Sequence, residues 1–334
     1  MVSMKEVAHA AGVSIGTVSG VLNGKTTIKP ENYHKVMDAV ERLGYQPNMV
    51  ARSLRTNTSN SIGLIIPDIT NPYYPELERG VEDVAKDAGQ TLILCNSDRN
   101  PVQEWELALS LVQKQVDGII IAKPKMTREQ LETISRYCKL VLVDGTEEEL
   151  GEFDLVNVDC GSAARSALNV LMSHGHRKIA YIGGFIDSSS ARQRLDAYLD
   201  VLKERGMECR SEWVETCSYS WRAGRDAALK ILARNKEQPT AFFVANDIIA
   251  LGVIRGLQDC GLRVPEDVSV CGFDDIALAE LYYPALTTVR QPKYEIGRLS
   301  AQMLLQRISG ASTEPVHRIL DANVVFRDTV ARVK

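Results

Sequence analysis

Apolar and polar positions alternate with a helical period in three short segments near the start of the chain. Ser3 and Glu6 form the Ser-x-x-Glu pattern of a helix N-terminal capping box, and apolar residues follow at helical spacing. Ser14 is placed to cap a second short helix, and Pro30 suits the first turn of a third. Two short helices joined by a glycine-containing turn predict a helix-turn-helix unit.

From Ser61 onward the pattern changes to short Val/Ile/Leu runs that alternate with helical stretches. The runs are SIGLIIP, TLILCN, DGIIIA, KLVLVD, KIAYIGG, TAFFVAN, DVSVCGF and LTTVR. Such runs predict buried parallel strands, and the periodicity between them predicts helices such as 74–88 and 102–115. The pattern occurs twice, with a shift near Asp159. The fold class that follows is an α-helical head plus an α/β body of two doubly wound parallel-sheet lobes that face each other across a cleft.

Composition narrows the class of protein. The 334 residues are 45% hydrophobic and 25% charged, which is typical of a soluble globular protein of two or three domains. No run is apolar and long enough to span a membrane, and MVSMKEVAHAAG carries charge where a secretory signal needs apolar residues, so we expect a cytoplasmic protein. The seven cysteines form no C-x-x-C pair. We therefore expect reduced thiols, no metal site and no cofactor.

Charge is distributed unevenly along the chain. Residues 1–60 hold seven Lys/Arg against four Asp/Glu, a net charge of +3, whereas the remainder has a net charge of −7. A small basic head on a larger acidic body indicates a nucleic-acid-binding module joined to a part with another task.

The segments KEVAHAAGVSIGTVSGVLNG and ERLGYQPNMVARSLRT closely resemble the head and hinge of the LacI family of bacterial transcription regulators. The resemblance implies that the second helix enters the major groove and that the segment from Asn48 to Leu54 folds into a hinge helix on DNA. Leu54 matches the leucine that family members insert into the minor groove; the alternative is that it only packs on the body. The DNA-binding residues implied are Ser14, Ile15, Gly16, Thr17, Gly20, Asn23, Tyr45, Asn48, Ala51, Arg52, Leu54 and Arg55.

The second helix departs from the family pattern at one position. Gly20 stands where family members commonly have an arginine that reads a guanine edge. Glycine cannot make that bidentate contact with guanine O6 and N7. Either the operator differs from the usual family sequence, which we favour, or DNA binding is weak and depends on a partner.

The resemblance continues through IIPDITNPYY, SHGHRKIAYIGG, FVANDIIALGVIRGL and VCGFDDIALAELYYPALTTVRQP. The family body is built like the periplasmic sugar-binding proteins, and its chain crosses between the lobes three times. The domains expected are a helix-turn-helix domain at 1–46, a hinge helix and linker at 47–60, an N-terminal lobe at 61–159 and 291–318, and a C-terminal lobe at 160–290 and 319–334.

Residues just after the strands are the candidates for a ligand-binding cleft, because ligands of open parallel sheets bind beyond the carboxyl ends of the strands. Those with ring, amide or charged side chains include Asn71, Asn96, Asp144, Arg192 and Asp274. From these positions and the family motifs we expect an effector site made of Asp68, Tyr73, Tyr74, Lys123, Phe185, Ser190, Arg194, Trp221, Asn246, Asp247 and Asp275. Aromatic rings with paired donors and acceptors suit a polar ring. Asp247 has an alternative role as a helix cap, and Asp274 as a turn residue.

Enzyme function is not supported by the motifs. The chain has no G-x-G-x-x-G after a strand, no G-x-x-x-x-G-K-[ST] and no H-E-x-x-H. His174 and His176 flank a glycine in a predicted turn, so we assign them a structural role and expect no catalytic residues. A periplasmic solute-binding protein would share the body, but it needs a signal peptide and no basic head.

These observations predict a homodimeric transcription regulator, most simply a repressor, that binds double-stranded operator DNA of pseudo-palindromic sequence. A small polar effector, sugar-like or nucleobase-like, would bind the cleft and change DNA affinity. The alternative is control by a protein co-regulator, with a vestigial cleft. Assembly into a tetramer is left open.

Overall fold

The computed structural model describes residues 2–22, 28–45, 58–145, 148, 152–186, 189–234 and 237–333. The chain divides into two compact units, Met1–Ser59 and Asn60–Lys334, which we call the head and the body. In the described part, no helix is both long and apolar enough to cross a membrane.

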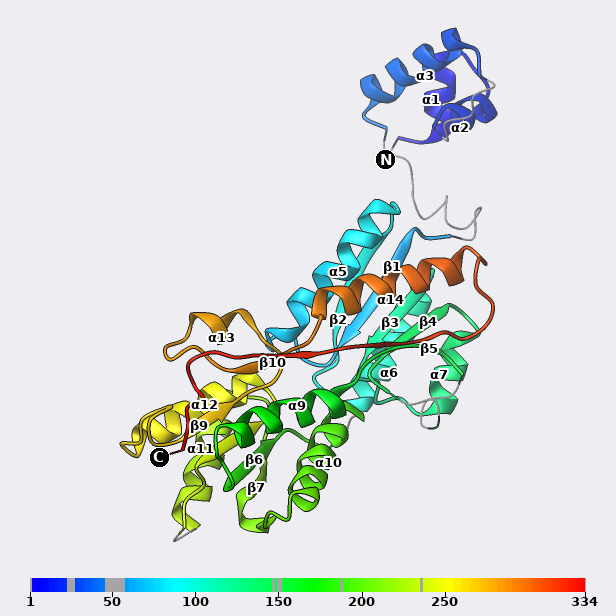
Figure 1. The fold of residues 1–334 in the computed structure, drawn as a ribbon. Coiled ribbons are helices and arrows are strands. Elements are labelled where there is room, and N and C mark those ends of the chain that lie inside the picture. The colour runs from blue at the N-terminus through cyan, green and yellow to red at the C-terminus, as the bar shows by residue number, and fades with distance from the viewer. Residues whose placement is uncertain are drawn as a thin grey trace. The chain divides into compact units, whose positions relative to one another are not determined.

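The head contains three helices: α1 (Met4–Ala11), α2 (Ile15–Leu22) and α3 (Pro30–Leu43) (Figure 1). The predicted capping box is present, since the Ser3 hydroxyl accepts a hydrogen bond from the Glu6 amide and the Glu6 carboxylate accepts one from the Ser3 amide at 2.7 Å. Gly12 ends α1 in the left-handed conformation, with φ of 64°. The apolar faces of the helices meet in a small core that includes Val7, Val18, Val21, Val36 and Ala39.

The first lobe of the body is built on a six-stranded parallel sheet in the order β11-β5-β4-β3-β1-β2. Its strands are β1 (Ser61–Ile66), β2 (Thr91–Asn96), β3 (Gly118–Ala122), β4 (Lys139–Val143), β5 (Asp154–Val158) and β11 (His317–Leu320). Its helices are α5 (Tyr73–Asp87), α6 (Pro101–Gln113), α7 (Arg128–Ser135) and α14 (Lys293–Ile308). The helices α5 and α6 lie within two residues of their predicted ranges.

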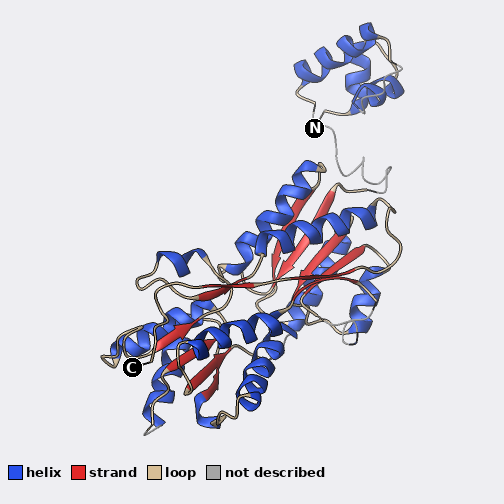
Figure 2. Ribbon diagram, in the orientation of Figure 1, coloured by secondary structure: helices blue, strands red, loops and turns tan. Residues whose placement is uncertain are grey.

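Side chains of β1 alternate between the two faces of this sheet, as the period of a strand requires. Ile62, Leu64 and Ile66 pack on one face against α5 and α14. Ile65 packs on the other face against α6 and α7. Both faces of the sheet are therefore covered by helices, as expected for parallel strands (Figure 2).

The second lobe has a four-stranded parallel sheet in the order β7-β6-β8-β9. Its strands are β6 (Ile179–Gly183), β7 (Val214–Thr216), β8 (Ala241–Val244) and β9 (Ser269–Cys271). Its helical elements are α9 (Cys160–Ser173), α10 (Ser189–Glu204), η1 (Ser211–Trp213), α11 (Trp221–Arg234), α12 (Asp247–Asp259) and α13 (Ala277–Leu281). One face packs on α9 and α10 and the other on α11 and α12. The predicted fold class, a helical head with a two-lobed α/β body, is confirmed.

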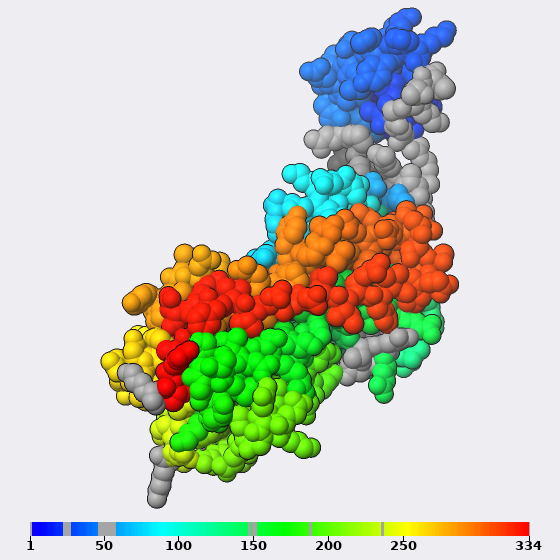
Figure 3. Space-filling view, viewed as in Figure 1, coloured from blue at the N-terminus to red at the C-terminus, as the bar shows by residue number. Residues whose placement is uncertain are grey.

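The chain passes between the lobes three times: from β5 to α9, from β10 (Thr288–Arg290) to α14, and from β11 to β12 (Asn323–Val325). The strands β10 and β12 pair antiparallel at this junction. The C-terminal segment, red in Figure 3, runs over the surface past both lobes. Because β11 pairs with β5 as far as Leu320, the first lobe extends two residues beyond the predicted limit of 318.

The helices α5 and α14 touch backbone to backbone at two glycines. A Cβ atom added to Gly80 would collide with the carbonyl oxygen of Tyr294, and one added to Gly297 would collide with that of Leu77. These two helices can lie this close only because both positions lack a side chain, so the first lobe has a tightly joined helical layer on one face.

Candidate functional site

The first candidate site is the exposed face of α2 in the head. The Ser14 hydroxyl caps this helix by accepting a hydrogen bond from the Thr17 amide at 3.1 Å, and the two hydroxyls lie 2.9 Å apart. Ser14, Ile15 and Gly16 are exposed, and Thr17 is half-buried. Ile15 is 48% exposed although it is a large apolar residue in a small unit with its own core. This face of the helix is therefore available to a partner.

Two residues expected at the DNA interface are buried in the head. Tyr45 is a member of the head core, and Gly20 is buried on α2. Tyr45 directly follows Gly44, the C-cap of α3, and its side chain is buried in the head core, so its assignment is corrected to a core position. Gly20 has no side chain with which to reach outward, so it offers no group to a base edge. The other expected contacts, Asn23, Asn48, Ala51, Arg52, Leu54 and Arg55, lie outside the described residues.

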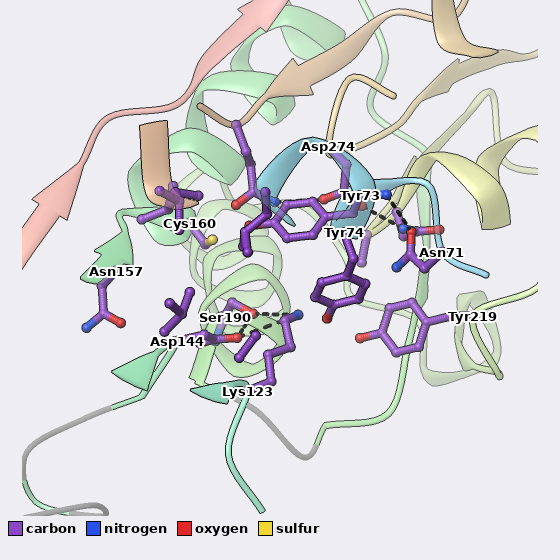
Figure 4. A pocket seen from close by; sticks show the side chains of 18 of the residues that line it. Asn71, Tyr73, Tyr74, Lys123, Asp144, Asn157, Cys160, Ser190, Tyr219 and Asp274 are labelled. Atoms are coloured by element: carbon purple, nitrogen blue, oxygen red, sulfur yellow. Dashed lines mark hydrogen bonds and ion pairs between the residues drawn. The ribbon is translucent and has the colours of Figure 1, made fainter. Parts of the chain in front are cut away.

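The second candidate site is a pocket in the cleft between the two lobes of the body (Figure 4). The space inside the pocket that no atom fills is about 590 Å³, its open mouth included. Only about 30 Å³ offers positions at which the centre of a water molecule fits without touching the walls. Its walls therefore lie close together. The charged, polar and aromatic lining residues are Asn71, Tyr73, Tyr74, Arg99, Lys123, Asp144, Asn157, Cys160, Ser190, Arg194, Tyr219, Asn246, Asp274 and Gln291.

Six of the expected effector-binding residues are brought together in this lining. Tyr73 and Tyr74 begin α5, and their rings meet edge to face with centroids 5.1 Å apart. The remaining four are Lys123, Ser190, Arg194 and Asn246. Burial raises the pKa of Tyr74 from its usual value near 10 to about 12, so its hydroxyl stays protonated, and able to donate a hydrogen bond, even well above neutral pH.

Three other expected residues lie outside the lining because of where their side chains are held. Phe185 and Trp221 are 47% and 46% exposed. The Asp68 carboxylate turns back to accept hydrogen bonds from the amide and hydroxyl of Thr70, at 2.9 and 2.6 Å. In this structure, none of the three side chains reaches the pocket.

Asp247 and Asp275 are also held away from the pocket, by stronger contacts. Asp247 is completely buried and accepts hydrogen bonds from the Thr288 hydroxyl at 2.5 Å and the Ile276 amide at 2.9 Å. Asp275 forms ion pairs with Arg290 and Arg327 at 2.5 and 2.7 Å. Burial alone would raise the pKa of Asp275, but the two arginines outweigh it and lower that pKa. Both carboxylates hold the second lobe together and are not free to contact a ligand.

Asp274, next to Asp275, points into the pocket instead. Its carboxylate accepts hydrogen bonds from the side-chain amides of Asn246 at 2.6 Å and Gln291 at 2.7 Å. Asn246 also caps α12 by accepting from the Ile249 amide. Burial raises the pKa of Asp274, while the charges of Arg194 and Lys123 oppose that rise.

The lobes are joined across the pocket by Lys123, Asp144 and Ser190. Lys123 and Asp144 follow β3 and β4 of the first lobe, and Ser190 lies in the first turn of α10 in the second. Asp144 accepts hydrogen bonds from the amide and hydroxyl of Ser190, at 2.9 and 2.6 Å, and thus binds the N-terminus of α10 as a cap would. Lys123 Nζ donates to the Ser190 hydroxyl at 3.2 Å and lies 3.5 Å from Asp144. We call these three residues the cross-lobe contact.

A second connection across the cleft involves Arg99 and Tyr219. The Arg99 guanidinium lies over the Tyr219 ring, 4.2 Å from its centroid. Arg99 follows β2 of the first lobe and Tyr219 follows β7 of the second. Sequence reasoning missed both residues, as it missed Asn157, Cys160 and Gln291. Arg99 could have been found because it comes three positions after the end of a strand, where cleft residues are expected.

Comparison with known proteins identifies both parts of the chain. Residues 3–48 match the lacI family of bacterial regulatory proteins, and residues 168–330 match a periplasmic binding protein-like domain. Over 329 residues, or 98% of this chain and 99% of the relative, the sequence is 36% identical to catabolite control protein A of Priestia megaterium. The chain belongs to the LacI family of transcription regulators. It is therefore a regulator that binds DNA, and not an enzyme.

Other members of the LacI family give the same result. The HTH-type transcriptional repressor PurR of Photobacterium profundum is 34% identical over 335 residues, covering 99% of each chain. The lac repressor dimer bound to operator and the anti-inducer ONPF superposes with a TM-score of 0.89 at 26% identity, covering 99% of each chain. The complex of the regulator CelR with cellobiose gives a TM-score of 0.74 at 30% identity and covers 98% of this chain and all of that one.

His174 and His176 have contacts of a structural kind in this LacI-family body. His174 stacks on Phe326, with ring centroids 5.2 Å apart. His176 is buried, and its ring nitrogens lie 3.0 Å from the Thr240 hydroxyl and 3.0 Å from the carbonyl oxygen of Ala331. Within the described ranges, no group of three or more His, Cys, Asp or Glu residues is placed to hold a metal ion.

Proposed function

We propose that this LacI-family regulator binds a pseudo-palindromic operator as a homodimer, and that a small polar effector, sugar-like or nucleobase-like, in the cleft pocket controls its affinity for DNA. The observation that carries the proposal is a pocket whose walls come from both lobes and include the buried, positively charged Arg194. A ligand that contacts both walls binds one lobe arrangement more tightly than another, which is the requirement for shifting a conformational equilibrium.

The head supplies the DNA contacts in this proposal. The exposed face of α2 offers Ser14, Ile15, Gly16 and Thr17 to the major groove. A net charge of +3 over residues 1–60 favours binding to phosphates. The similar lac repressor was solved as a dimer bound to operator, which supports a dimer here. The remaining proposed DNA contacts are Asn23 in the helix-turn-helix domain and Asn48, Ala51, Arg52, Leu54 and Arg55 in the hinge.

The effector contacts in this proposal are Tyr73, Tyr74, Lys123, Ser190, Arg194 and Asn246, with Asp274 added from the structure. Similar regulators have been solved with cellobiose and with ribose bound. These sugars present hydroxyls on a compact ring, and the pocket has the aromatic, amide and charged groups to bind such a molecule. A regulator that acts on chromosomal DNA would work in the cytoplasm.

Control by a protein co-regulator with a vestigial cleft is the second candidate. Such a cleft has no need of a buried charge, since an unpaired buried ion costs several kcal/mol. The presence of Arg194 in the pocket therefore favours a small-molecule effector.

Gel-shift titration tests the DNA part. Sequences selected from a random pool with the full-length protein should have two inverted half-sites, and their binding should weaken steeply as salt is raised, because phosphate contacts release counterions. A body-only protein that starts at Ser61 should lose specific binding. Specific binding retained by the body alone would refute the proposed role of the head. Selected sites with a single half-site would argue against the dimer.

A further inference from the structure

The charged groups of the pocket are unequally satisfied. Among the described lining residues, three are cationic, Arg99, Lys123 and Arg194, and two are carboxylates, Asp144 and Asp274. Both carboxylates already have their partners: Asp144 binds Ser190 and Lys123, and Asp274 binds the amides of Asn246 and Gln291. The pocket has therefore one more positive than negative charge, and no lining carboxylate without partners.

Arg194 is a buried cation with no hydrogen-bond acceptor among the described residues. Its side chain is 2% exposed, and among the residues that the structure describes none forms an ion pair or hydrogen bond with its guanidinium. The ring of Phe273 lies below it, 4.8 Å from the guanidinium carbon to the centroid, and this contact leaves the N–H groups at the edge unused. Nε in particular is buried with no acceptor. A guanidinium has five N–H donors in a fork that matches a carboxylate or phosphate, so an acid group would satisfy several of them together.

Arg194 is charged in this environment. Burial opposes the charged form, but the nearby Cys160, Tyr219 and Asp274 outweigh burial and raise its pKa. A buried charge that lacks a counter-ion is unfavourable, and a ligand that supplies one is bound more tightly than a neutral ligand of the same shape.

One further feature of the lining favours an anion. Arg99 contacts the ring of Tyr219 and has no carboxylate partner in the described part of the chain. Asp144 already caps the α10 terminus, and the Asp159 carboxylate caps the α9 terminus by accepting a hydrogen bond from the Ser162 amide at 2.9 Å, so Arg99 is the additional positive group.

We infer that the effector carries an acid group, a carboxylate or a phosphoryl group, that pairs with Arg194. The inference rests on the proposed function, because it concerns the same pocket, and it narrows the effector from polar molecules in general to acidic ones. The polar body of the effector lies against Tyr73 and Tyr74, and Asp274 accepts hydrogen bonds from its hydroxyl or amino groups.

The test compares neutral molecules with acidic molecules of nearly the same shape. The probes are glucose with glucuronate and glucose 6-phosphate, galactose with galacturonate, ribose with ribose 5-phosphate, and inorganic phosphate alone. Differential scanning fluorimetry of the full-length protein measures the change in melting temperature at 10 mM of each probe and constant ionic strength. We expect at least one acidic probe to raise Tm by several degrees and its neutral counterpart to raise it far less. Comparison of the Tm shifts with the uronates and with the sugar phosphates shows whether the acid group of the effector is a carboxylate or a phosphoryl group.

Variants assign the effect to the pocket. Arg194→Gln should abolish the response to acidic probes, and Arg99→Gln should weaken it. Arg192→Gln removes the same charge two positions away on α10, at a residue outside the pocket lining, and should leave the response unchanged. A Tm of the Arg194→Gln protein without probe that equals or exceeds the wild-type value would show that this variant is folded. If the Arg194→Gln protein does not fold, the weaker response of the Arg99→Gln protein to acidic probes is the deciding measurement.

Two results would overturn the inference. One is a neutral probe that stabilises the protein as much as its acidic counterpart and changes operator binding, which would leave the proposed effector function standing. The other is the absence of any stabilisation by acids that depends on Arg194 or Arg99, inorganic phosphate included. If in addition no neutral probe changed Tm or operator binding, the proposed effector function would lose its support as well.

Discussion

Asp144 of the first lobe caps the N-terminus of α10 in the second lobe through Ser190, at 2.9 Å to the amide and 2.6 Å to the hydroxyl. Helix caps usually come from the residue that precedes the helix. Here the capping carboxylate comes from the other lobe, so closure of the lobes and satisfaction of the helix terminus occur together. The positive φ angles of Lys123 and Asp144, 54° and 67°, show that the first lobe uses uncommon backbone conformations to present both side chains.

The first prediction concerns this cross-lobe contact. Ser190→Ala removes the hydroxyl that Asp144 and Lys123 share, and a hydrogen bond to a charged group contributes about 1.5–3 kcal/mol. The melting temperature of the body should fall by about 2–4 °C for each kcal/mol lost. The matched control is Ser189→Ala, which removes a hydroxyl that accepts a hydrogen bond from the Gln193 side chain within α10. Equal losses from both variants would show that the cross-lobe contact adds nothing.

A double-mutant cycle makes the same test sharper. Ser190→Ala removes the donor and Asp144→Ala the acceptor of the same hydroxyl–carboxylate hydrogen bond. The effect of the double variant should therefore be smaller than the sum of the two single effects by at least about 0.5 kcal/mol. Additive effects would contradict the direct contact between the lobes.

The second prediction concerns the contact between α5 and α14. Gly80→Ala places a Cβ against the carbonyl oxygen of Tyr294, and one of the helices must move. Overpacking of this kind costs about 1–3 kcal/mol or more, and because the neighbour is backbone we expect the upper end of that range. Gly161→Ala is the control, since its Cβ meets only a side-chain oxygen of Asp159 at 3.7 Å. Urea denaturation of both variants provides the comparison, and a Gly80 variant as stable as the Gly161 variant would contradict the close approach.

The third prediction concerns pH and His176. Burial lowers the pKa of His176 below its usual value of 6.5, and nearby His174 lowers it further, while the hydrogen bond to Ala331 opposes the change. The unfolded chain therefore binds more protons than the folded one between the two pKa values. The resulting stability is present above about pH 6.5 and is lost as the pH falls below it, by about 1.4 kcal/mol for each unit of the shift.

His176→Gln should reduce the fall in Tm between pH 7 and pH 5. His317→Gln, at an exposed position of the same body, should leave that fall unchanged. Parallel Tm curves for wild type and His176→Gln would show that this histidine does not titrate on unfolding.

The fourth prediction separates Asp275 from the pocket. Asp275→Ala leaves Arg290 and Arg327 without their shared carboxylate, and both side chains belong to segments near the junction of the lobes. We expect a lower Tm but an undiminished rise in Tm with any ligand that binds the pocket. Asp274→Ala should instead abolish the rise in Tm with ligand and have the smaller effect on the Tm of the ligand-free protein. If the Asp275 variant lost the rise in Tm with ligand, Asp275 would have to be counted among the ligand-binding residues after all.

The case of Asp274 and Asp275 also shows where sequence reasoning stops. The position of this pair after a strand predicted that it lies at the cleft, and of the two residues Asp274 lines the pocket. Which of the two carboxylates faces the pocket depends on the backbone, and both residues have positive φ angles, 115° and 53°. In a regular strand, alternate side chains point to opposite faces, but no such rule holds in a turn of this kind.

The head and the cross-lobe contact show the same limit in other ways. Capping and helical spacing located the three helices of the head, because those signals are local. Tyr45 was expected at the DNA, yet it lies in the core, and only the packing of three helices against each other determines that. Lys123 and Ser190 were both expected in the cleft, but their contact joins residues 67 positions apart in separate lobes. Their proximity depends on how far the lobes close.

The three crossings between the lobes restrict how the body can move. The strands β10 and β12 of two crossings are paired, and the helix α9, which follows the remaining crossing, contacts both strands. Three adjacent connections permit rotation of one lobe against the other but resist sliding and twisting, as expected of hinge motion. Any molecule in the pocket can therefore affect the rest of the protein only by changing a single angle, that between the two lobes. Ligands of different chemistry that produce the same angle would have the same effect.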